Sequence, residues 1–198
     1  MIFQPTYFSP ISQYQQIVKA DKVVFEVFDN YQKQTYRSRF KIFSANGLLN
    51  LSIPVKYSNH PRSKTRDVLI DSSFKWQLNH WRSLKNAYQS SPYFEFYEDD
   101  LAPFYEKEQK FLLDFLLKTQ ELVFDMLQLD IKPEFTETYV VDYQEYTDFR
   151  ALANAKNPHE SYNRKEYKQV FDNKYGFLPN LSILDLIFNE GPNALLFL

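Results

Sequence analysis

The stretch Val23-Val24-Phe25-Glu26-Val27-Phe28 most constrains the fold, because it is almost continuously apolar. Strands that read this way are usually covered on both faces, as in parallel sheets. A shorter apolar run, Met1 to Phe3, precedes it, and Ser9-Pro10 between the two suits the start of a helix. The helical spacing that follows involves Ile11, Tyr14, Ile17 and Val18. The sequence therefore predicts a right-handed βαβ unit with parallel strands.

Polar residues end both apolar runs, Gln4 the first and Asp29 the second. They are either ordinary turn residues or part of a binding cleft, because ligands of open parallel sheets bind outside the carboxyl ends of the strands. In the second interpretation Tyr7 joins them in the cleft floor. The chain has only three glycines, which excludes a P-loop and a glycine-rich dinucleotide loop. Any phosphate must then be held by side chains or by a helix N-terminus.

The segment from 30 to 66 is strongly basic and contains no Asp or Glu. Residues 36–43 alternate with period two, so one strand face carries Arg37, Arg39 and Lys41. Like charges on one face repel each other, and a bound anion would relieve that repulsion. Because the whole chain has a net charge of only −2, we expect a small anionic ligand and no nucleic acid.

A hairpin is predicted around Asn46-Gly47, since this pair accepts the positive φ of a tight turn. The returning strand is followed by a cationic stretch, 56–66, which we expect to form a mobile cover over the cleft. Farther along, we expect a helix over 102–127 and a strand over 136–141. Helical spacing also links Trp76, His80, Leu84 and Tyr88.

His80 has two interpretations. It is either a hydrogen-bonded core residue or a general acid or base, since imidazole titrates near neutrality. In the second interpretation His80 and Asp29 are the catalytic pair, and Gln4, Tyr7, Arg37, Arg39, Lys41 and Asp185 bind the substrate.

Asp185 interrupts the apolar run of the last predicted helix, which ends at Gly191-Pro192. A buried carboxylate needs a partner. That partner is either one of the arginines 37 and 39, which Asp185 would clamp over the cleft, or a group on a neighbouring helix. The helical group would be His80, as in a catalytic triad, or another polar side chain. We favour the clamp, because anion sites commonly need an acidic group to fix their arginines.

Composition sets the remaining bounds. With 198 residues the chain is expected to be a single domain of the α/β class. This domain has an N-terminal βαβ unit, a β-hairpin insertion and a mostly helical C-terminal half packed on the sheet. The absence of cysteine, of a leader-like N-terminus and of a long apolar stretch favours a cytoplasmic protein with no membrane span. Three histidines and no cysteine predict no metal centre, although carboxylate ligation stays open.

Four motifs together resemble the WbqC-like family of bacterial proteins, in its Bacteroidetes-type branch. They are QPTYF with ADKVVFEVFDNYQKQTYRSRFKI, then WQLNHWRSLKNAY, SPYFEFY and LSILDLIFNEG. The resemblance covers nearly the whole chain and implies a link to surface polysaccharide biosynthesis. The first strand and its loop also resemble HxGH-type nucleotidylyltransferases. The stretch from Tyr7 to Tyr14 lacks histidine and glycine, so this second resemblance concerns the fold and not adenylyl transfer.

Two hypotheses follow. In the first, the protein is an enzyme, a transferase, acting on a phosphate-bearing small molecule. Its substrate would be a nucleotide-linked sugar or an activated acyl or aminoacyl donor. In the second, it is a non-catalytic ligand-binding or scaffold protein of a biosynthetic complex. The sequence names no cofactor for either.

Overall fold

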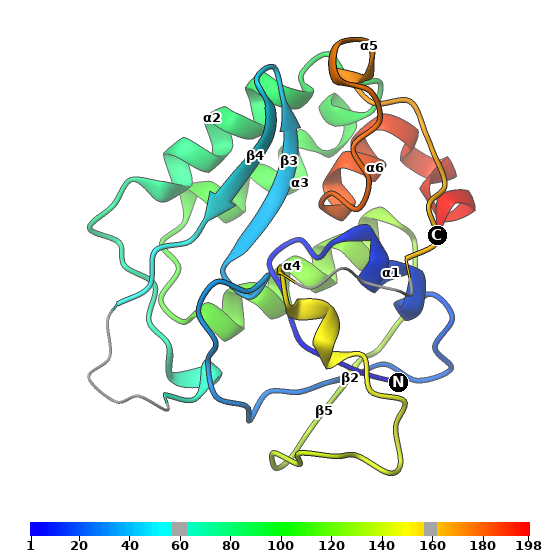
Figure 1. The fold of residues 1–198 in the computed structure, drawn as a ribbon. Coiled ribbons are helices and arrows are strands. Elements are labelled where there is room, and N and C mark those ends of the chain that lie inside the picture. Colours follow the sequence, from blue (N-terminus) through cyan, green and yellow to red (C-terminus); the bar gives the residue numbers. More distant parts are fainter. Residues whose placement is uncertain (57–62, 157–161) are drawn as a thin grey trace.

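The N-terminal unit is the predicted βαβ arrangement. In the computed structural model, which describes residues 1–56, 63–156 and 162–198, β1 (Ile2–Phe3) and β2 (Val24–Phe25) are parallel neighbours. Helix α1 (Ile11–Ile17) connects them (Figure 1). Strand β5 (Glu134–Phe135) continues the parallel sheet beside β2, in the order β1-β2-β5. On the other side of β1, a parallel bridge joins Ile2 to Asp148.

The predicted hairpin is formed by β3 (Arg39–Ser44) and β4 (Gly47–Ser52). Gly47 adopts φ +92°, the positive value expected of a glycine in this turn. The alternation is confirmed from Arg39 onward, because Phe40 and Ile42 are buried while Arg39 and Lys41 are half-buried. Arg37 precedes the strand and is buried, so it does not share the cationic face as predicted. One face of the hairpin therefore packs on the core and the other carries the cations.

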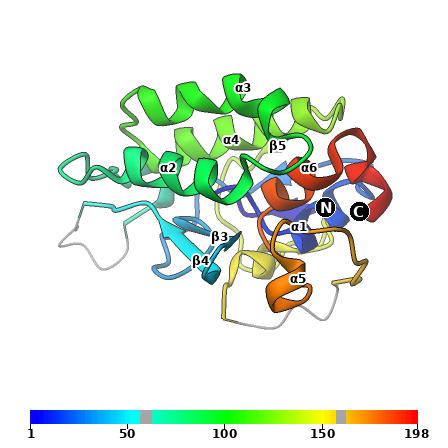
Figure 2. The ribbon, with the colours of Figure 1, turned by 90° about the horizontal axis from the view of Figure 1, so that it is seen from above.

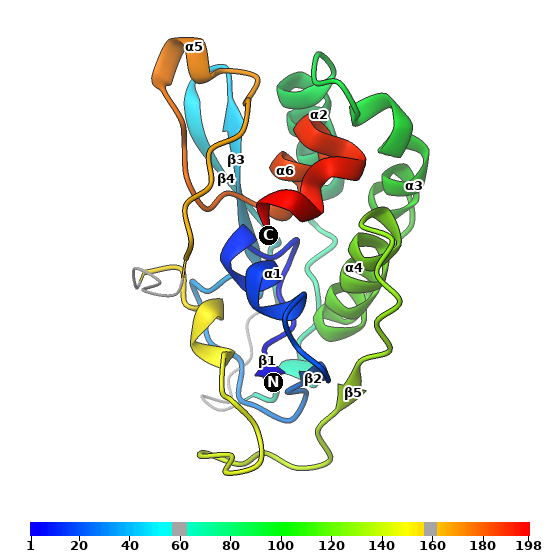
Figure 3. The same ribbon diagram turned by 90° about the vertical axis from the view of Figure 1, so that its right-hand side faces the viewer.

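Three helices form one layer of the molecule: α2 (Trp76–Tyr88), α3 (Phe94–Glu106) and α4 (Leu112–Met126) (Figure 2). The hairpin lies on the other side, with α6 (Ile183–Glu190) and the short α5 (Asp172–Tyr175) at the same end of the molecule (Figure 3). Short 3₁₀ helices span Thr65–Asp67, Arg150–Ala153 and Gly191–Phe197. The core between the layers combines aliphatic side chains with many aromatic ones, which include Phe8, Phe40, Tyr88, Phe115 and Phe188. The α/β class and its arrangement are thus as predicted.

Two sequence-based boundaries are wrong. The single helix expected over 102–127 is two helices, because the residues between α3 and α4 pair with another segment. Ile70 N donates to Lys110 O at 3.0 Å, and Leu112 N donates to Val68 O at 2.9 Å. This short antiparallel pairing, centred on Leu69 and Phe111, interrupts the helix.

The strand expected over 136–141 is likewise wrong, since β5 ends at Phe135. The Thr136 N–H still donates to Phe25 O at 3.0 Å, but the chain then leaves the sheet. The carbonyls of Val140 and Val141 accept hydrogen bonds from the Arg150 guanidinium. Apolar residues on this segment stay at the surface, and Val141 is 77% exposed. Val140 and Val141, whose β-branched side chains favoured a strand, therefore lie in a loop.

The end of α6 gives a stability prediction. Gly191 has φ +51°, and a Cβ there would lie 2.5 Å from Cδ1 of the Tyr93 ring. Gly191→Ala should therefore combine backbone strain with a clash, and should lower the free energy of unfolding by about 2 kcal/mol or more. Urea denaturation measures this change.

Gly176 is the matched control. It also has positive φ, +73°, but a Cβ there meets nothing within 4 Å. Gly176→Ala should show the backbone cost alone, about 1 kcal/mol. Equal losses in the two variants would contradict the proposed clash with Tyr93.

Candidate functional site

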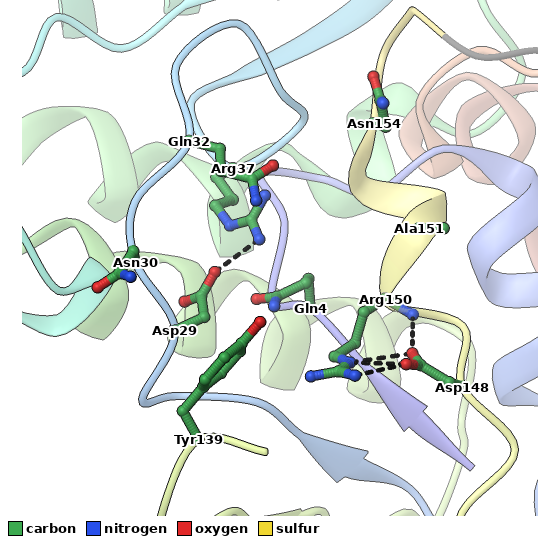
Figure 4. A pocket seen from close by; sticks show the side chains of 10 residues that line it. All are labelled: Gln4, Asp29, Asn30, Gln32, Arg37, Tyr139, Asp148, Arg150, Ala151 and Asn154. Atoms are coloured by element: carbon green, nitrogen blue, oxygen red, sulfur yellow. Dashed lines mark hydrogen bonds and ion pairs between the residues drawn. The ribbon is translucent and has the colours of Figure 1, made fainter. Parts of the chain in front are cut away.

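A pocket of about 300 Å³ opens at the carboxyl ends of the parallel strands. Gln4 directly follows β1, and Asp29 lies just beyond β2. This is the edge at which open parallel sheets place their ligands. The pocket is lined by Gln4, Asp29, Asn30, Gln32, Arg37, Tyr139, Asp148, Arg150, Ala151 and Asn154 (Figure 4).

A buried ion pair forms one side of the pocket. Arg37 Nη2 donates to Asp29 Oδ2 at 2.6 Å, and each side chain is only 4% exposed. Thr65 Oγ1 donates to the other carboxylate oxygen at 2.6 Å. Arg37 Nη1 reaches Thr35 Oγ1 at 3.3 Å, whereas Arg37 Nε is buried without a hydrogen-bond partner. Asp29 therefore fixes the guanidinium, whose Nε–H is left without an acceptor.

A second ion pair, between Arg150 and Asp148, lies across the pocket (Figure 4). Arg150 Nε donates to both oxygens of Asp148 at 3.0 Å. Its Nη1 donates to Val140 O and its Nη2 to Val141 O, each at 2.8 Å. Burial favours a raised pKa of Asp148, but the hydrogen bonds from Arg150 outweigh it and lower that pKa below its usual value. Arg150 thus holds the segment after β5 at the pocket and keeps Asp148 ionised.

Gln4 lies between the two ion pairs, with Tyr139 beside it (Figure 4). Its side chain is 3% exposed, and Oε1 has no hydrogen-bond partner. Its backbone carbonyl accepts from Gln13 Nε2 at 3.0 Å, which fixes the main chain at the end of β1. A buried amide that keeps an unpaired oxygen beside a pocket is available to a ligand.

The structure brings Gln4, Asp29 and Arg37 together but places Tyr7 and His80 elsewhere. The Tyr7 hydroxyl is 3.0 Å from His80 Nδ1 and 3.0 Å from the Tyr105 hydroxyl. All three side chains are buried beneath the hairpin and outside the pocket lining. Burial lowers the pKa of His80 to about 4, against the effect of a hydrogen bond with the Ser52 backbone. The imidazole is therefore neutral near pH 7, and a catalytic role for His80 stays a prediction.

The depressed pKa of His80 predicts an acid-sensitive fold. Between the ordinary value of 6.5 and about 4, the unfolded chain binds the proton and the folded protein does not. Stability is therefore complete above pH 6.5 and is lost as the pH falls, by roughly 3 kcal/mol at pH 4. Urea denaturation at pH 7 and pH 4 measures the loss.

His80→Asn supplies the control for that experiment, because it removes the titrating ring and keeps a polar group near the position of Nδ1. The variant should be less stable at every pH, since a buried ring is lost. Its stability should nevertheless fall less than that of the wild type on acidification. An unchanged pH dependence would show that His80 is not the group responsible.

The other two hairpin cations, Arg39 and Lys41, do not line the pocket. Lys41 Nζ lies 5.6 Å from the centre of the Tyr36 ring. Arg39 Nε is buried without a hydrogen-bond partner. Arg37 precedes β3, and this position allows it to turn toward Asp29 while Arg39 and Lys41 stay on the strand. Substrate binding by Arg39 and Lys41 stays a prediction.

Asp185 pairs neither with His80 nor with the arginines 37 and 39, but the alternative of another polar group on a neighbouring helix is confirmed by Tyr88 of α2. This fully buried carboxylate accepts from the Tyr88 hydroxyl at 2.7 Å, the Tyr167 hydroxyl at 2.6 Å and Gln169 Nε2 at 2.9 Å. The reason is packing, because α6 lies against the end of α2 and against residues 167–169. The clamp expected of Asp185 is provided by Asp29, which holds Arg37.

Sequence reasoning missed Asp148 and Arg150, which belong to a segment that reads as a polar loop, and Tyr139, which belongs to the segment expected to be a strand. Two long-range hydrogen bonds place it: Ile2 N donates to Thr147 O at 3.0 Å, and Phe149 N donates to Ile2 O at 2.9 Å. No spacing in the sequence signals this pairing with β1. Asn30 and Gln32 could have been predicted from the sequence, since they belong to the DNYQ motif that begins with Asp29.

The cationic cover expected over 56–66 falls partly on residues 57–62, which lie outside the described residues. In the described part of this segment, Lys64 Nζ donates to Phe28 O at 2.9 Å, and the Arg66 guanidinium lies 4.7 Å from the centre of the Phe28 ring.

Within 1–56, 63–156 and 162–198, no cluster of three or more His, Asp and Glu side chains could hold a metal ion. Across those same ranges, no helix is long and apolar enough to cross a membrane.

Comparison with known proteins agrees with the motifs. The WbqC-like protein family model matches residues 4–157 and 140–196. A protein of Mycobacterium tuberculosis named "Uncharacterized protein Rv1507c" is 27% identical over 201 residues, which cover 86% of this chain and 85% of that protein. No solved structure gives a significant match. Because the family model covers nearly the whole chain, this protein belongs to the WbqC-like family.

Proposed function

We propose that this protein is a transferase of surface polysaccharide biosynthesis that acts on a phosphate-bearing small molecule. The candidate substrates are a nucleotide-linked sugar and an activated acyl or aminoacyl donor. The observation that carries the proposal is the buried Asp29–Arg37 pair, held at 2.6 Å in a pocket at the carboxyl ends of the strands. The biosynthetic setting is the one that the family resemblance implies.

The ion pair supports anion binding because it orients the arginine before the ligand arrives. Asp29 holds Nη2 and Thr35 holds Nη1, so the guanidinium plane is fixed, and Nε lacks an acceptor. A phosphate oxygen is an acceptor suited to such a donor. Lys64 adds positive charge near the rim, since its Nζ lies 5.8 Å from the centre of the Tyr139 ring. The arrangement suits a phosphate near Arg37 and Lys64.

The carboxylates supply the candidate acid–base groups. Asp29 and Asp148 both line the pocket, and each is fixed by an arginine. A carboxylate placed in this way can accept a proton from an attacking hydroxyl group of the acceptor substrate. We keep Asp29 as the proposed catalytic residue, because it lies at the buried end of the pocket beside Arg37.

A second candidate function is a non-catalytic ligand-binding or scaffold role. The observation in its favour is that both carboxylates in the pocket are already engaged by arginines. In addition, His80 lies outside the pocket lining. A ligand that binds without being consumed would favour this candidate.

A thermal-shift screen followed by a turnover assay tests the proposal. Nucleotide-linked sugars, acyl-coenzyme A and aminoacyl donors should include a ligand that raises the melting temperature of the wild type. Asn30→Ala changes an exposed residue at the rim of the pocket and should weaken the binding of that ligand. Asn50→Ala changes an exposed residue of β4 outside the pocket lining and should leave binding unchanged. No shift with any phosphate-bearing ligand would refute the proposal.

A further inference from the structure

The buried end of the pocket is matched to an uncharged, hydrogen-bonding group. Gln4 is 3% exposed, its Oε1 lacks a partner, and it lies between the two ion pairs (Figure 4). A side-chain amide offers both a donor and an acceptor. A hydroxyl group can satisfy both, because it also donates and accepts, whereas a phosphate oxygen can only accept.

The four charged side chains that line the pocket are already paired with one another, and Arg150 also lies 3.6 Å from the buried Glu26. Arg37 pairs with Asp29 at 2.6 Å and Arg150 pairs with Asp148 at 2.5 Å, so the formal charges of the lining residues cancel. The ammonium group of an aminoacyl donor would meet only aspartates that arginines already engage. A phosphate can also approach Lys64, whose Nζ donates to the Phe28 carbonyl and forms no ion pair within the described residues. Beside Gln4, the balance favours a neutral polar group.

Apolar walls are scarce among the lining residues. Ala151 is the one aliphatic side chain in the lining, so an acyl chain would find little surface on which to bury its methylene groups. The remaining apolar surface is the ring of Tyr139, which also carries a hydroxyl group. Four amide side chains complete the lining: Gln4, Asn30, Gln32 and Asn154.

We infer that the buried end of this pocket binds the hydroxyl groups of a sugar ring through Gln4, and that the substrate is a nucleotide-linked sugar. This inference rests on the proposed function and selects among its candidate substrates. The volume of the pocket, about 300 Å³, lies at the small end of the range for ligand pockets. It suits one sugar ring better than a whole nucleotide sugar. The phosphates then lie on the Arg37 side of Gln4 (Figure 4), toward Lys64.

Isothermal titration calorimetry tests the inference with matched pairs of ligands. The pairs are UDP-glucose with UDP, GDP-mannose with GDP, dTDP-glucose with dTDP and acetyl-coenzyme A with coenzyme A. At least one nucleotide sugar should bind the wild type tenfold or more tightly than its nucleotide. Gln4→Leu should remove most of that difference and leave nucleotide binding unchanged, whereas Asn50→Ala should keep both. Circular dichroism reports whether Gln4→Leu folds. If that variant does not fold, the affinity ratios of the wild type for each pair of ligands still test the inference.

The outcomes separate the inference from the proposed function. The inference fails and the proposed function stands if every nucleotide binds as tightly as its sugar conjugate. The same holds if acetyl-coenzyme A binds more tightly than coenzyme A and no nucleotide sugar binds more tightly than its nucleotide. If methyl glucoside or methyl mannoside binds and Gln4→Leu abolishes that binding while no phosphate-bearing ligand binds, the hydroxyl site stands and the proposed function fails. If none of these compounds binds, both fail.

Discussion

Asp29→Ala should lower the free energy of unfolding by about 3–5 kcal/mol, because it leaves the Arg37 guanidinium buried without its counter-charge. The two side chains are each 4% exposed and 2.6 Å apart, so water cannot replace the lost carboxylate without opening the structure. The same change also removes the acceptor of Thr65 Oγ1. Urea denaturation at pH 7 measures the difference from the wild type.

The control for this variant is an ion pair with the same distance between its charged atoms but with exposed side chains. Arg164 and Glu166 also lie 2.6 Å apart, but their side chains are 55% and 62% exposed. Glu166→Ala should cost at most about 1 kcal/mol, since exposed pairs gain little in water. A double change, Asp29→Leu with Arg37→Met, should restore much of the stability that Asp29→Ala loses. If Asp29→Ala costs no more than Glu166→Ala, the ion pair does not hold the pocket together.

Local patterns were sufficient to predict the framework of the fold. The apolar run around Val24 and Phe25 required a covered strand, and β2 pairs there with β1 and β5. Period-two alternation located the hairpin, and the glycine at 47 located its turn. From the βαβ topology alone, Gln4 and Asp29 could be assigned to one edge of the sheet, where both line the pocket. These inferences succeed because each depends on neighbours within one unit of the chain.

Contacts between distant segments could not be predicted in the same way. The Arg150–Asp148 pair reaches the pocket because the chain around 147–149 bonds to Ile2, and no local pattern encodes that pairing. The break before α4 has a similar cause, since it depends on the segment around Val68. Burial of Asp185 was correctly expected from its apolar neighbours, yet its partners come from α2 and from residues 167–169. Side-chain partners are set by packing that the pattern of one helix does not contain.

Asp185→Ala is the second change with a large expected effect. It leaves the buried hydroxyls of Tyr88 and Tyr167 without an acceptor, and it removes one acceptor of Gln169 Nε2, which still donates to Leu178 O at 2.9 Å. Each unsatisfied hydroxyl donor costs about 1–3 kcal/mol, so the loss should be at least about 2 kcal/mol. Burial raises the pKa of both tyrosines well above the usual value, so both hydroxyls stay protonated donors at any pH of the experiment. Urea denaturation at pH 5 measures the loss.

Asp185→Asn tests whether the carboxylate itself is the sensitive group, because asparagine resembles the neutral acid and does not titrate. Burial raises the pKa of Asp185, although hydrogen bonds from Tyr167, Tyr88 and Gln169 oppose the increase. Between the ordinary value near 4 and the raised one, the folded protein binds more protons than the unfolded chain, so this residue's contribution to stability falls as the pH rises. The stability of the wild type minus that of Asp185→Asn should therefore be greatest below about pH 4 and should shrink toward pH 7. His80 titrates in both proteins and cancels in this difference. A difference that grows with pH would mean that the three hydrogen bonds outweigh burial and that Asp185 is stabilised as the anion.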